Sequence, residues 1–252
     1  MKLTPYYRDS LVTLWHCDAR LVLPTIGSGS IQLVFTDPPY GHNNNNNSDL
    51  AHNWEAALGL VKRVSQEDAR PIANDSRDEA DSLFDYVIEE SKRVLEKGCC
   101  CCCCCGGGGP DPQFARWALR MDETIGFKHA VVWDKGGLGL GWHFRRNYEM
   151  VLVAQNGNPL RAWNGGNDTP NVIRLNGIKP SAEDHPTPKP VELPSHFIRL
   201  LTHHGDTVLD PCSGGGSTLI AAKNLGRKAI GIEIDERWCE LAAKRLSQGV
   251  LF

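Results

Sequence analysis

The sequence predicts one α/β domain, residues 1–252, with a mostly parallel sheet, helices on both faces and one antiparallel hairpin at an edge. Strand-like and helix-like segments alternate through most of the chain, which is typical of such sheets. The run 31–36 consists mostly of β-branched and apolar residues, as strands buried on both faces do. A content of 41% hydrophobic and 23% charged residues fits an ordinary globular domain.

The N-terminal half begins with two expected strands, 11–16 and 31–36, joined by a short helix near 19–26. A long helix is expected over Leu83–Glu96, because its apolar residues recur on one face. Gly98 then provides the left-handed residue that commonly ends a helix.

Seven of the ten cysteines are contiguous, Cys99–Cys105. Neighbouring residues of an extended chain point to opposite faces, so this run cannot surround a metal ion tetrahedrally. Reduced cysteine behaves as a small hydrophobe, and we interpret the run as a buried core strand rather than a metal or redox site. Persistent thiols indicate a reducing compartment. The chain has no apolar run of the ~20 residues that cross a membrane and no signal-peptide pattern, so a cytoplasmic protein is expected.

The rest of the chain continues the alternation. The expected helices are 112–122, 191–202, 217–225 and 236–246, and the expected strands are 128–133, 148–154, 207–210 and 229–233. The strands 128–133 and 148–154 are the pair expected to be antiparallel. Two stretches break the pattern: 41–80, which contains five consecutive asparagines, and 156–180, which is rich in Gly, Asn and Pro. Insertions of this length are normally functional or disordered.

The net charge of −3 does not by itself suggest a nucleic-acid partner. Its distribution is more informative, because residues 128–189 carry 8 Lys and Arg against 5 Asp and Glu, whereas residues 1–127 carry 12 against 18. A local basic face matters more for phosphate contact than the overall sum. An uneven surface without a function is the alternative.

The most informative stretch is Asp37-Pro38-Pro39-Tyr40, directly after the apolar run 31–36. Each proline fixes its φ angle and lacks an N–H group, so strand pairing must end there and the chain is stiff. A carboxylate and two carbonyls then point outward, where they can accept hydrogen bonds from an amino group, and Tyr40 offers a flat stacking surface. We therefore predict a clamp for a planar ring with an exocyclic amine, with a simple strand-ending turn as the alternative.

A second candidate site follows the expected strand 207–210, where a glycine-rich loop leads into a helix. Backbone N–H groups of such a loop can approach a ligand closely, and hydroxyls at the helix start suit a carboxylate or phosphate. Glu233 ends the next strand about twenty residues later and can accept both ribose hydroxyls of a nucleoside. The dehydrogenase fingerprint needs a third small residue where Leu219 stands, so a nucleoside cofactor other than NAD or FAD is favoured.

Together these motifs resemble the DNA amino-methyltransferases that use S-adenosyl-L-methionine. Asp37–Tyr40 resembles the catalytic motif DPPY. Asp210–Thr218 resembles the cofactor motif DPF-x-G-x-G-T-T, with Cys212 in place of Phe and Ser217 in place of the first Thr, and His185–Pro190 resembles the signature H-P-T-x-K-P. The catalytic motif comes first and the glycine loop last, which is similar to the permuted β class, and the resemblance extends over about 11–247.

The resemblance implies a Rossmann-like methyltransferase fold and methylation of adenine N6 or cytosine N4 in double-stranded DNA, with the target base flipped out. The implied catalytic residues are Asp37, Pro38, Pro39 and Tyr40. The implied cofactor-binding residues are Asp18, Asp37, Thr187, Lys189, Asp210, Pro211, Cys212, Ser213, Gly214, Gly216, Ser217, Thr218 and Glu233. DNA contacts are expected from the segments 41–80 and 156–180, with His42, Asn43, Arg145 and Arg146 as candidates, and no metal is expected.

Adenine is favoured over cytosine because the catalytic motif begins with Asp37 rather than serine. The alternatives are a cytosine-N4 methyltransferase, a nicotinamide-dependent oxidoreductase and a non-catalytic DNA-binding module. The resemblance further implies a bacterial or phage-encoded protein, and it is compatible with a homodimer and with a cognate restriction enzyme.

Overall fold

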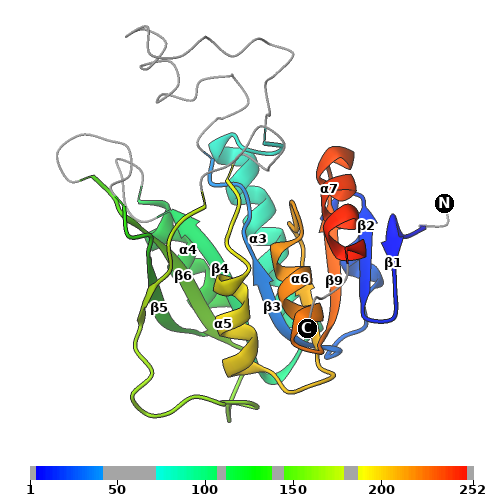
Figure 1. The fold of residues 1–252 in the computed structure, drawn as a ribbon. Helices are drawn as coiled ribbons and strands as arrows, with labels where there is room; N and C mark the ends of the chain where they lie inside the picture. The colour runs from blue at the N-terminus through cyan, green and yellow to red at the C-terminus, as the bar shows by residue number, and fades with distance from the viewer. Residues whose placement is uncertain (1–3, 42–71, 107–111, 138–144, 179–186, 249–252) are drawn as a thin grey trace, which may run out of the picture.

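The computed structural model describes residues 4–41, 72–106, 112–137, 145–178 and 187–248. Within these ranges nine strands form one sheet, in the order β1-β2-β9-β8-β3-β4-β6-β5-β7 (Figure 1). The strands are β1 (Tyr7–Arg8), β2 (Val12–His16), β3 (Ile31–Thr36), β4 (Leu95–Gly106), β5 (Phe127–Asp134), β6 (Tyr148–Gln155), β7 (Val172–Arg174), β8 (Thr207–Asp210) and β9 (Lys228–Glu233). The helices are α1 (Ala19–Val22), the short 3-10 helix η1 (Leu23–Thr25), α3 (Arg77–Val94), α4 (Gln113–Thr124), α5 (Glu192–Leu201), α6 (Ser217–Asn224) and α7 (Glu236–Ser247).

The sheet is mostly parallel, as predicted. β2, β9, β8, β3 and β4 pair in parallel, whereas β6 is antiparallel to both β4 and β5. Two short strands absent from the prediction lie at the edges: β7 pairs in parallel with β5 outside the hairpin, and β1 pairs antiparallel with β2. Because the parallel strands all end at the same edge of the sheet, the residues that follow β3, β8 and β9 come together there.

Both faces of the sheet are buried against helices. α1, α3 and α4 pack on one face, and α5, α6 and α7 pack on the other (Figure 1). The cysteines of β4 alternate between the two: Cys100, Cys102 and Cys104 belong to the cluster with α5, and the remaining four belong to the cluster with α3. All seven are at most 3% exposed, which confirms the prediction of a core strand.

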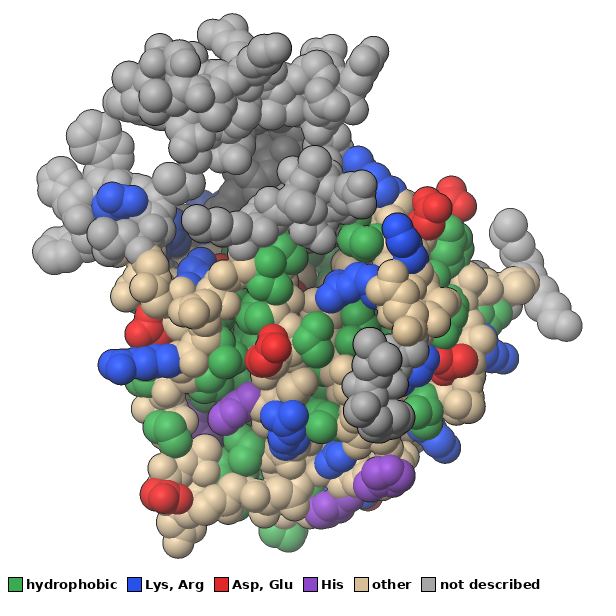
Figure 2. Space-filling view, viewed as in Figure 1, with side chains coloured by type: hydrophobic (Ala, Val, Ile, Leu, Met, Phe, Trp, Pro, Cys, Tyr) green, Lys and Arg blue, Asp and Glu red, His purple; other side chains and the backbone are tan. Residues whose placement is uncertain are grey.

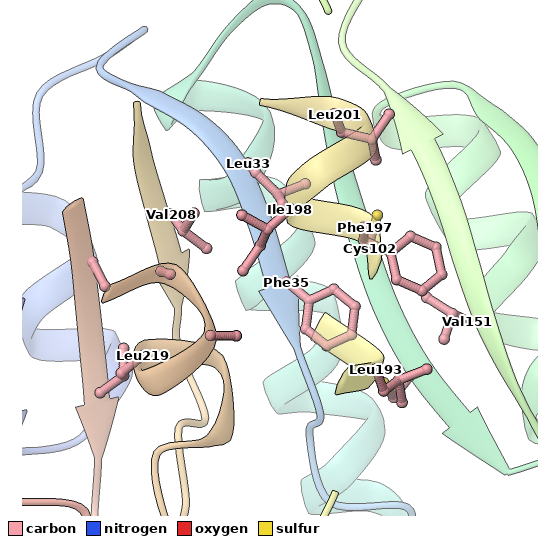
Figure 3. Packing of buried hydrophobic residues seen from close by; sticks show 14 of the residues in the cluster. Leu33, Phe35, Cys102, Val151, Leu193, Phe197, Ile198, Leu201, Val208 and Leu219 are labelled. Carbon is pink, nitrogen blue, oxygen red and sulfur yellow. The ribbon is translucent and has the colours of Figure 1, made fainter. Parts of the chain in front are cut away.

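Helix α5 is held firmly against the middle of the sheet. Its apolar side chains lie over β3, β4 and β6 (Figure 3), and the ring centroids of Phe197 and Phe35 are 5.4 Å apart. Full burial of an aromatic or aliphatic side chain contributes about 1.5–3 kcal/mol relative to exposure. This packing fixes the segment that precedes α5, and that segment carries Lys189.

Helix α3 is displaced from its expected bounds, and Gly98 has a different role from the one predicted. The helix begins at Arg77, where Ser76 and Glu79 form a reciprocal capping box, and ends at Val94. Gly98 is not its cap but a residue of β4 with a φ of 82°. A side chain at Gly98 would collide with the backbone of Pro159, so the glycine is required by a close approach of two chain segments.

The two segments expected to be insertions differ in what the structure describes. Residues 77–80 form the first turn of α3, and 42–71 lie outside the described residues. The segment 156–178 starts at the end of the sheet away from the carboxyl ends of the parallel strands, where Arg161 pairs with Asp206 at 2.7 Å. β7 then runs back toward those carboxyl ends beside β5. Across the described part of the chain, no helix has the length and apolar character needed to span a membrane.

Candidate active site

A cavity of about 460 Å³ lies at the carboxyl ends of β3, β8 and β9. Its volume falls within the roughly 300–1,000 Å³ that is typical of small-molecule sites. The segment Asp37–Tyr40 lines it after β3, Asp210–Gly215 lines it after β8, and Glu233–Asp235 lines it after β9. Two motifs that are far apart in the chain therefore open into one space.

Every residue predicted to be catalytic or to bind the cofactor lines this cavity, with the exception of Gly216. Those outside the three segments above are Asp18, Thr187, Lys189, Ser217 and Thr218. Gly216 is the residue directly before α6, where its left-handed conformation shapes the glycine loop.

The glycine loop is fixed by close packing between α6 and α7. Gly216 has a φ of 81°, a left-handed conformation that glycine adopts without strain. A Cβ atom on Gly216 would lie 2.9 Å from the Cβ of Ala242 on α7, so no side chain fits there. Arg245, also on α7, donates a hydrogen bond to the carbonyl of Gly215. Helix α7 thus holds the loop in place, and its Arg245 lines the cavity beside Gly214 and Gly215.

Two carboxylates face the cavity next to this loop. Glu233 accepts hydrogen bonds from the N–H groups of Gly214 and Asp235, each at 2.8 Å, and burial raises its pKa. Asp18 caps α1 and accepts the N–H of Arg20 at 2.8 Å. Carboxylates in these places can accept hydrogens from hydroxyl and amino groups, so a glycine loop flanked by two acids fits a nucleoside-bearing ligand.

Asp210 begins the loop and is almost completely buried, at 3% exposure. Its carboxylate accepts the N–H of Cys212 at 3.1 Å. Burial raises the pKa of Asp210 to about 7, although a hydrogen bond from Thr218 opposes the shift. This acid therefore changes its charge near neutral pH and is sensitive to any cation that binds beside it.

The clamp residue Asp37 is engaged on both of its carboxylate oxygens. Lys189 Nζ lies 2.7 Å from Oδ2, and the Tyr40 hydroxyl donates to Oδ1 at 2.7 Å. Burial raises the pKa of Asp37, and the charge of Lys189 opposes that rise. The ring of Tyr40 packs edge-on against Trp117, with 6.4 Å between centroids, and Lys189 Nζ lies 5.2 Å from the centroid of the same tyrosine ring.

Two further charged residues, Glu149 and Lys135, belong to this site although no sequence motif identifies them. Glu149, near the start of β6, lies 3.2 Å from Lys189 Nζ, and its other oxygen accepts a hydrogen bond from Lys135 Nζ at 2.8 Å. Burial opposes ionisation of Glu149, but the two lysines outweigh it and lower its pKa to about 2. The available signal was that Glu149 is the single charged residue in an otherwise apolar strand, YEMVLVAQ.

The candidate DNA contacts are only partly described. Arg146 lines the cavity and Arg145 does not, while His42 and Asn43 lie outside the described residues. Figure 2 shows Lys and Arg side chains spread over the visible face among acidic and uncharged ones. Arg161 contributes to the positive surplus of the middle segment, but it forms its ion pairs with Glu96 and Asp206 at the opposite end of the sheet.

The chain shares its sequence pattern and fold with proteins of known activity. Residues 31–244 match the N6/N4 DNA methylase family. The type II methyltransferase M2.LlaDCHI of Lactococcus lactis subsp. cremoris is 27% identical, over 98% of this chain and 94% of the relative. The DNA adenine methyltransferase YhdJ of Escherichia coli K12 is 29% identical, over 93% of this chain and 82% of the relative. The PvuII DNA methyltransferase, which is cytosine-N4-specific, has the same fold, with a TM-score of 0.73 at 18% identity over 96% of this chain and 89% of the PvuII chain.

Proposed function

Because the chain belongs to the N6/N4 DNA methylase family, we propose that it transfers a methyl group from S-adenosyl-L-methionine to the exocyclic N6 of adenine in double-stranded DNA. One observation carries this proposal: the carboxylate clamp after β3 and the glycine loop after β8 open into the same cavity. With the family match, this arrangement disfavours a nicotinamide-dependent oxidoreductase and a non-catalytic binding module.

The residues along the cavity suit the parts of the cofactor. S-adenosyl-L-methionine, when bound, supplies an electrophilic methyl group on a sulfonium centre. Glu233 fits the ribose hydroxyls because its carboxylate stands at the end of β9 beside the loop, and Asp18, after the neighbouring strand β2, fits the adenine amino group. Asp210 lies close enough to Asp37 for their charges to interact and fits the ammonium end of the cofactor.

The clamp makes a poor nucleophile reactive. The lone pair of an aromatic amine is delocalised into its ring, so most of the work is placement and polarisation of that amine. The Asp37 carboxylate and the Pro38 carbonyl accept its two hydrogens and draw the nitrogen toward tetrahedral geometry. Tyr40 stacks on the base, whose extraction from the duplex costs a few kcal/mol.

The transfer needs no covalent enzyme intermediate. The amine lone pair forms the nitrogen–carbon bond while the carbon–sulfur bond breaks, and that bonding pair stays on the sulfur. The nitrogen then releases one of its two hydrogens as a proton, and Asp37, which already accepts that hydrogen, receives it. Cys212 is not the nucleophile, because burial raises the pKa of its thiol well above the ordinary value and keeps it protonated.

Adenine is the favoured base, and cytosine N4 is the second candidate. The catalytic motif begins with an aspartate, and the relative YhdJ is an adenine methyltransferase. The amine of cytosine presents the same two hydrogens to Asp37 and Pro38, so the clamp alone accepts either base.

The DNA partner and the biological setting complete the proposal. Arg146 at the cavity, with the segment 41–80 and the later part of 156–180, is our candidate set of DNA contacts. The type II methyltransferase relative supports a role in restriction and modification, with a cognate endonuclease, in the cytoplasm of a bacterial host. A homodimer is part of the same proposal.

A product analysis tests the proposed reaction. Unmethylated duplex DNA is incubated with the protein and S-adenosyl-L-methionine, digested to nucleosides and analysed by mass spectrometry. The expected product is N6-methyladenine, and an Asp37→Ala variant should give none. N4-methylcytosine would select the second candidate, and full activity of Asp37→Ala would contradict the mechanism.

A further inference from the structure

We propose that Lys189 and Glu149 are positioning residues for methyl transfer: Lys189 holds Asp37 ionised, and Glu149, which contacts the same Lys189, keeps that lysine and Asp37 aligned. This inference rests on the proposed function and adds two residues to its machinery. It also gives the side chain of Lys189 a role different from the cofactor contact that the sequence resemblance implies.

The geometry is a ring of close contacts in which Lys189 bridges two carboxylates and the Tyr40 hydroxyl lies between them. Lys189 Nζ lies 2.7 Å from Asp37 Oδ2 and 3.2 Å from Glu149 Oε2. The Tyr40 hydroxyl lies 2.7 Å from Asp37 Oδ1 and 3.3 Å from the same Glu149 Oε2. The single hydroxyl hydrogen of Tyr40 is donated to Asp37, the nearer acceptor, and Glu149 is held by Lys189. Asp37 therefore cannot rotate without breaking a contact on one of its two oxygens.

Lys135 completes the balance of charge. It donates to Glu149 Oε1 at 2.8 Å, the oxygen that the ring leaves available. Glu149 is thus neutralised from outside the ring, and the charge of Lys189 remains effective on Asp37. Interactions between charges are strong here because both lysine-bound carboxylates are largely removed from water, with 22% and 18% of their side chains exposed.

The remaining groups around Asp37 do not replace this charge. Burial raises the pKa of Asp37, Lys189 lowers it and Glu149 raises it. The other titratable groups that act on or near it are Tyr40, Cys103, Cys104, Cys105, Asp210 and Cys212. All six are acids that are neutral when protonated and negative when ionised, so none of them supplies positive charge. Lys189 is the cation in direct contact with Asp37 among the described residues.

Lys189 also connects the clamp to the cofactor loop. Its backbone carbonyl accepts a hydrogen bond from the Ser217 hydroxyl at 2.8 Å, at the first residue of α6. The main chain of Lys189 therefore anchors the start of that helix, while its side chain reaches the clamp. An ionised carboxylate oxygen has more than one acceptor site, so a substrate amine can bind Asp37 without displacing Lys189.

The test is the pH dependence of single-turnover methyl transfer on unmethylated DNA. Lys189→Met removes the charge that favours ionised Asp37, so the acid limb of the rate profile should move up by about one pH unit. Glu149→Gln removes the charge that opposes ionisation, so the limb should move down. Lys189→Arg should restore the limb toward its wild-type position.

A matched control uses an equivalent ion pair outside the cavity. Lys223 Nζ lies 2.6 Å from Asp9, with 20% and 23% of the side chains exposed, and Lys223→Met should leave the limb in place. The affinity of each variant for S-adenosylhomocysteine is measured in parallel and should stay within about threefold of wild type for Lys189→Met, which is less than 1 kcal/mol.

Each outcome decides between roles. The inference is overturned if the acid limb stays at its wild-type pH in both Lys189→Met and Glu149→Gln. It is also overturned if the limb of Lys189→Met stays in place while this variant loses affinity for S-adenosylhomocysteine. Glu149→Gln is close to isosteric and carries the test alone if Lys189→Met does not fold. If the wild-type protein methylates no DNA, the proposed function is wrong. The inference is then tested separately by carbon-13 NMR, which measures whether the pKa of Asp37 is lower in Glu149→Gln than in wild type.

Discussion

Replacing Gly216 with alanine should distort the glycine loop, because the position requires both a left-handed residue and empty space. The φ angle of 81° is costly for a residue with a Cβ, by roughly 1–2 kcal/mol. The new Cβ would also lie 2.9 Å from the Cβ of Ala242, and overpacking of this kind costs about 1–3 kcal/mol. Either the loop or α7 has to move.

Gly29→Ala separates these two contributions. Gly29 has a φ of 64°, and a Cβ there would meet nothing within 4 Å. Gly29→Ala therefore introduces the same left-handed strain as Gly216→Ala, and the same gain of roughly 0.4–1 kcal/mol from a less flexible unfolded chain. Unlike Gly216→Ala, it introduces no collision. The difference in unfolding free energy between the two variants isolates the contact with α7 and should be about 1–3 kcal/mol, with Gly216→Ala the less stable.

Urea denaturation measures the stability difference, and calorimetric titration with S-adenosylhomocysteine measures its consequence for the loop. Loss of one well-placed hydrogen bond to a charged group costs about 1.5–3 kcal/mol, so Gly216→Ala should bind at least about tenfold more weakly while Gly29→Ala binds as wild type. Equal stability and equal affinity of the two variants would refute the assignment of the loop.

Other perturbations test separate parts of the account. Burial raises the pKa of Asp210 from 3.8 to about 7, so between these pH values the folded state keeps a proton that the unfolded chain releases. The free energy of unfolding should therefore fall as the pH rises from about 4 to about 7, by on the order of 4 kcal/mol. In Asp210→Asn this decrease in the free energy of unfolding between pH 5 and pH 8 should be absent, as measured by urea denaturation. The same decrease in the variant as in wild type would contradict the raised pKa of Asp210. Arg146→Ala should weaken DNA binding and reduce its salt dependence by about one ion. Arg161→Ala should leave DNA binding intact and lower the free energy of unfolding by about 1–3 kcal/mol. If a salt titration shows the reverse pattern, the DNA surface lies elsewhere. Ser76→Ala should destabilise the protein by about 1 kcal/mol through loss of the α3 cap, and a thermal unfolding curve identical to wild type would exclude the capping box.

The fold was largely predictable because its signals are local. Strand β3 is mostly apolar, β4 contains the unbroken run Cys99–Cys105, and the loop Asp210–Thr218 contains the glycines that a strand-to-helix turn needs. The edge strands β1 and β7 were not predictable, because two or three residues carry no periodicity and their conformation comes from the partner strand. Gly98 shows a further limit: its positive φ was foreseen, but the sequence does not reveal whether a helix end or a backbone contact demands it.

The candidate site, like the fold, contains residues that the sequence predicts and residues that it does not. The sequence predicts that Asp37 and Glu233 belong to the site because each lies at the end of a recognisable strand within a motif, and both line the cavity. Glu149 and Lys135 were not predicted to lie at the cavity, because their contacts join residues far apart in the chain and no local pattern reports such a contact. The lone acid in an apolar strand is the kind of inconsistency that marks a functional residue, and it was visible in the sequence.

The most direct test of the central claim is the single-turnover rate of methyl transfer by Asp37→Asn, measured together with its affinity for S-adenosylhomocysteine. The side chain keeps its shape but loses the charge that accepts the amine hydrogen and the proton. The account predicts a rate at least about 100-fold below wild type with cofactor affinity within about threefold. A rate within about tenfold of wild type, with the same cofactor affinity, would contradict the assignment of Asp37 as the group that activates the amine.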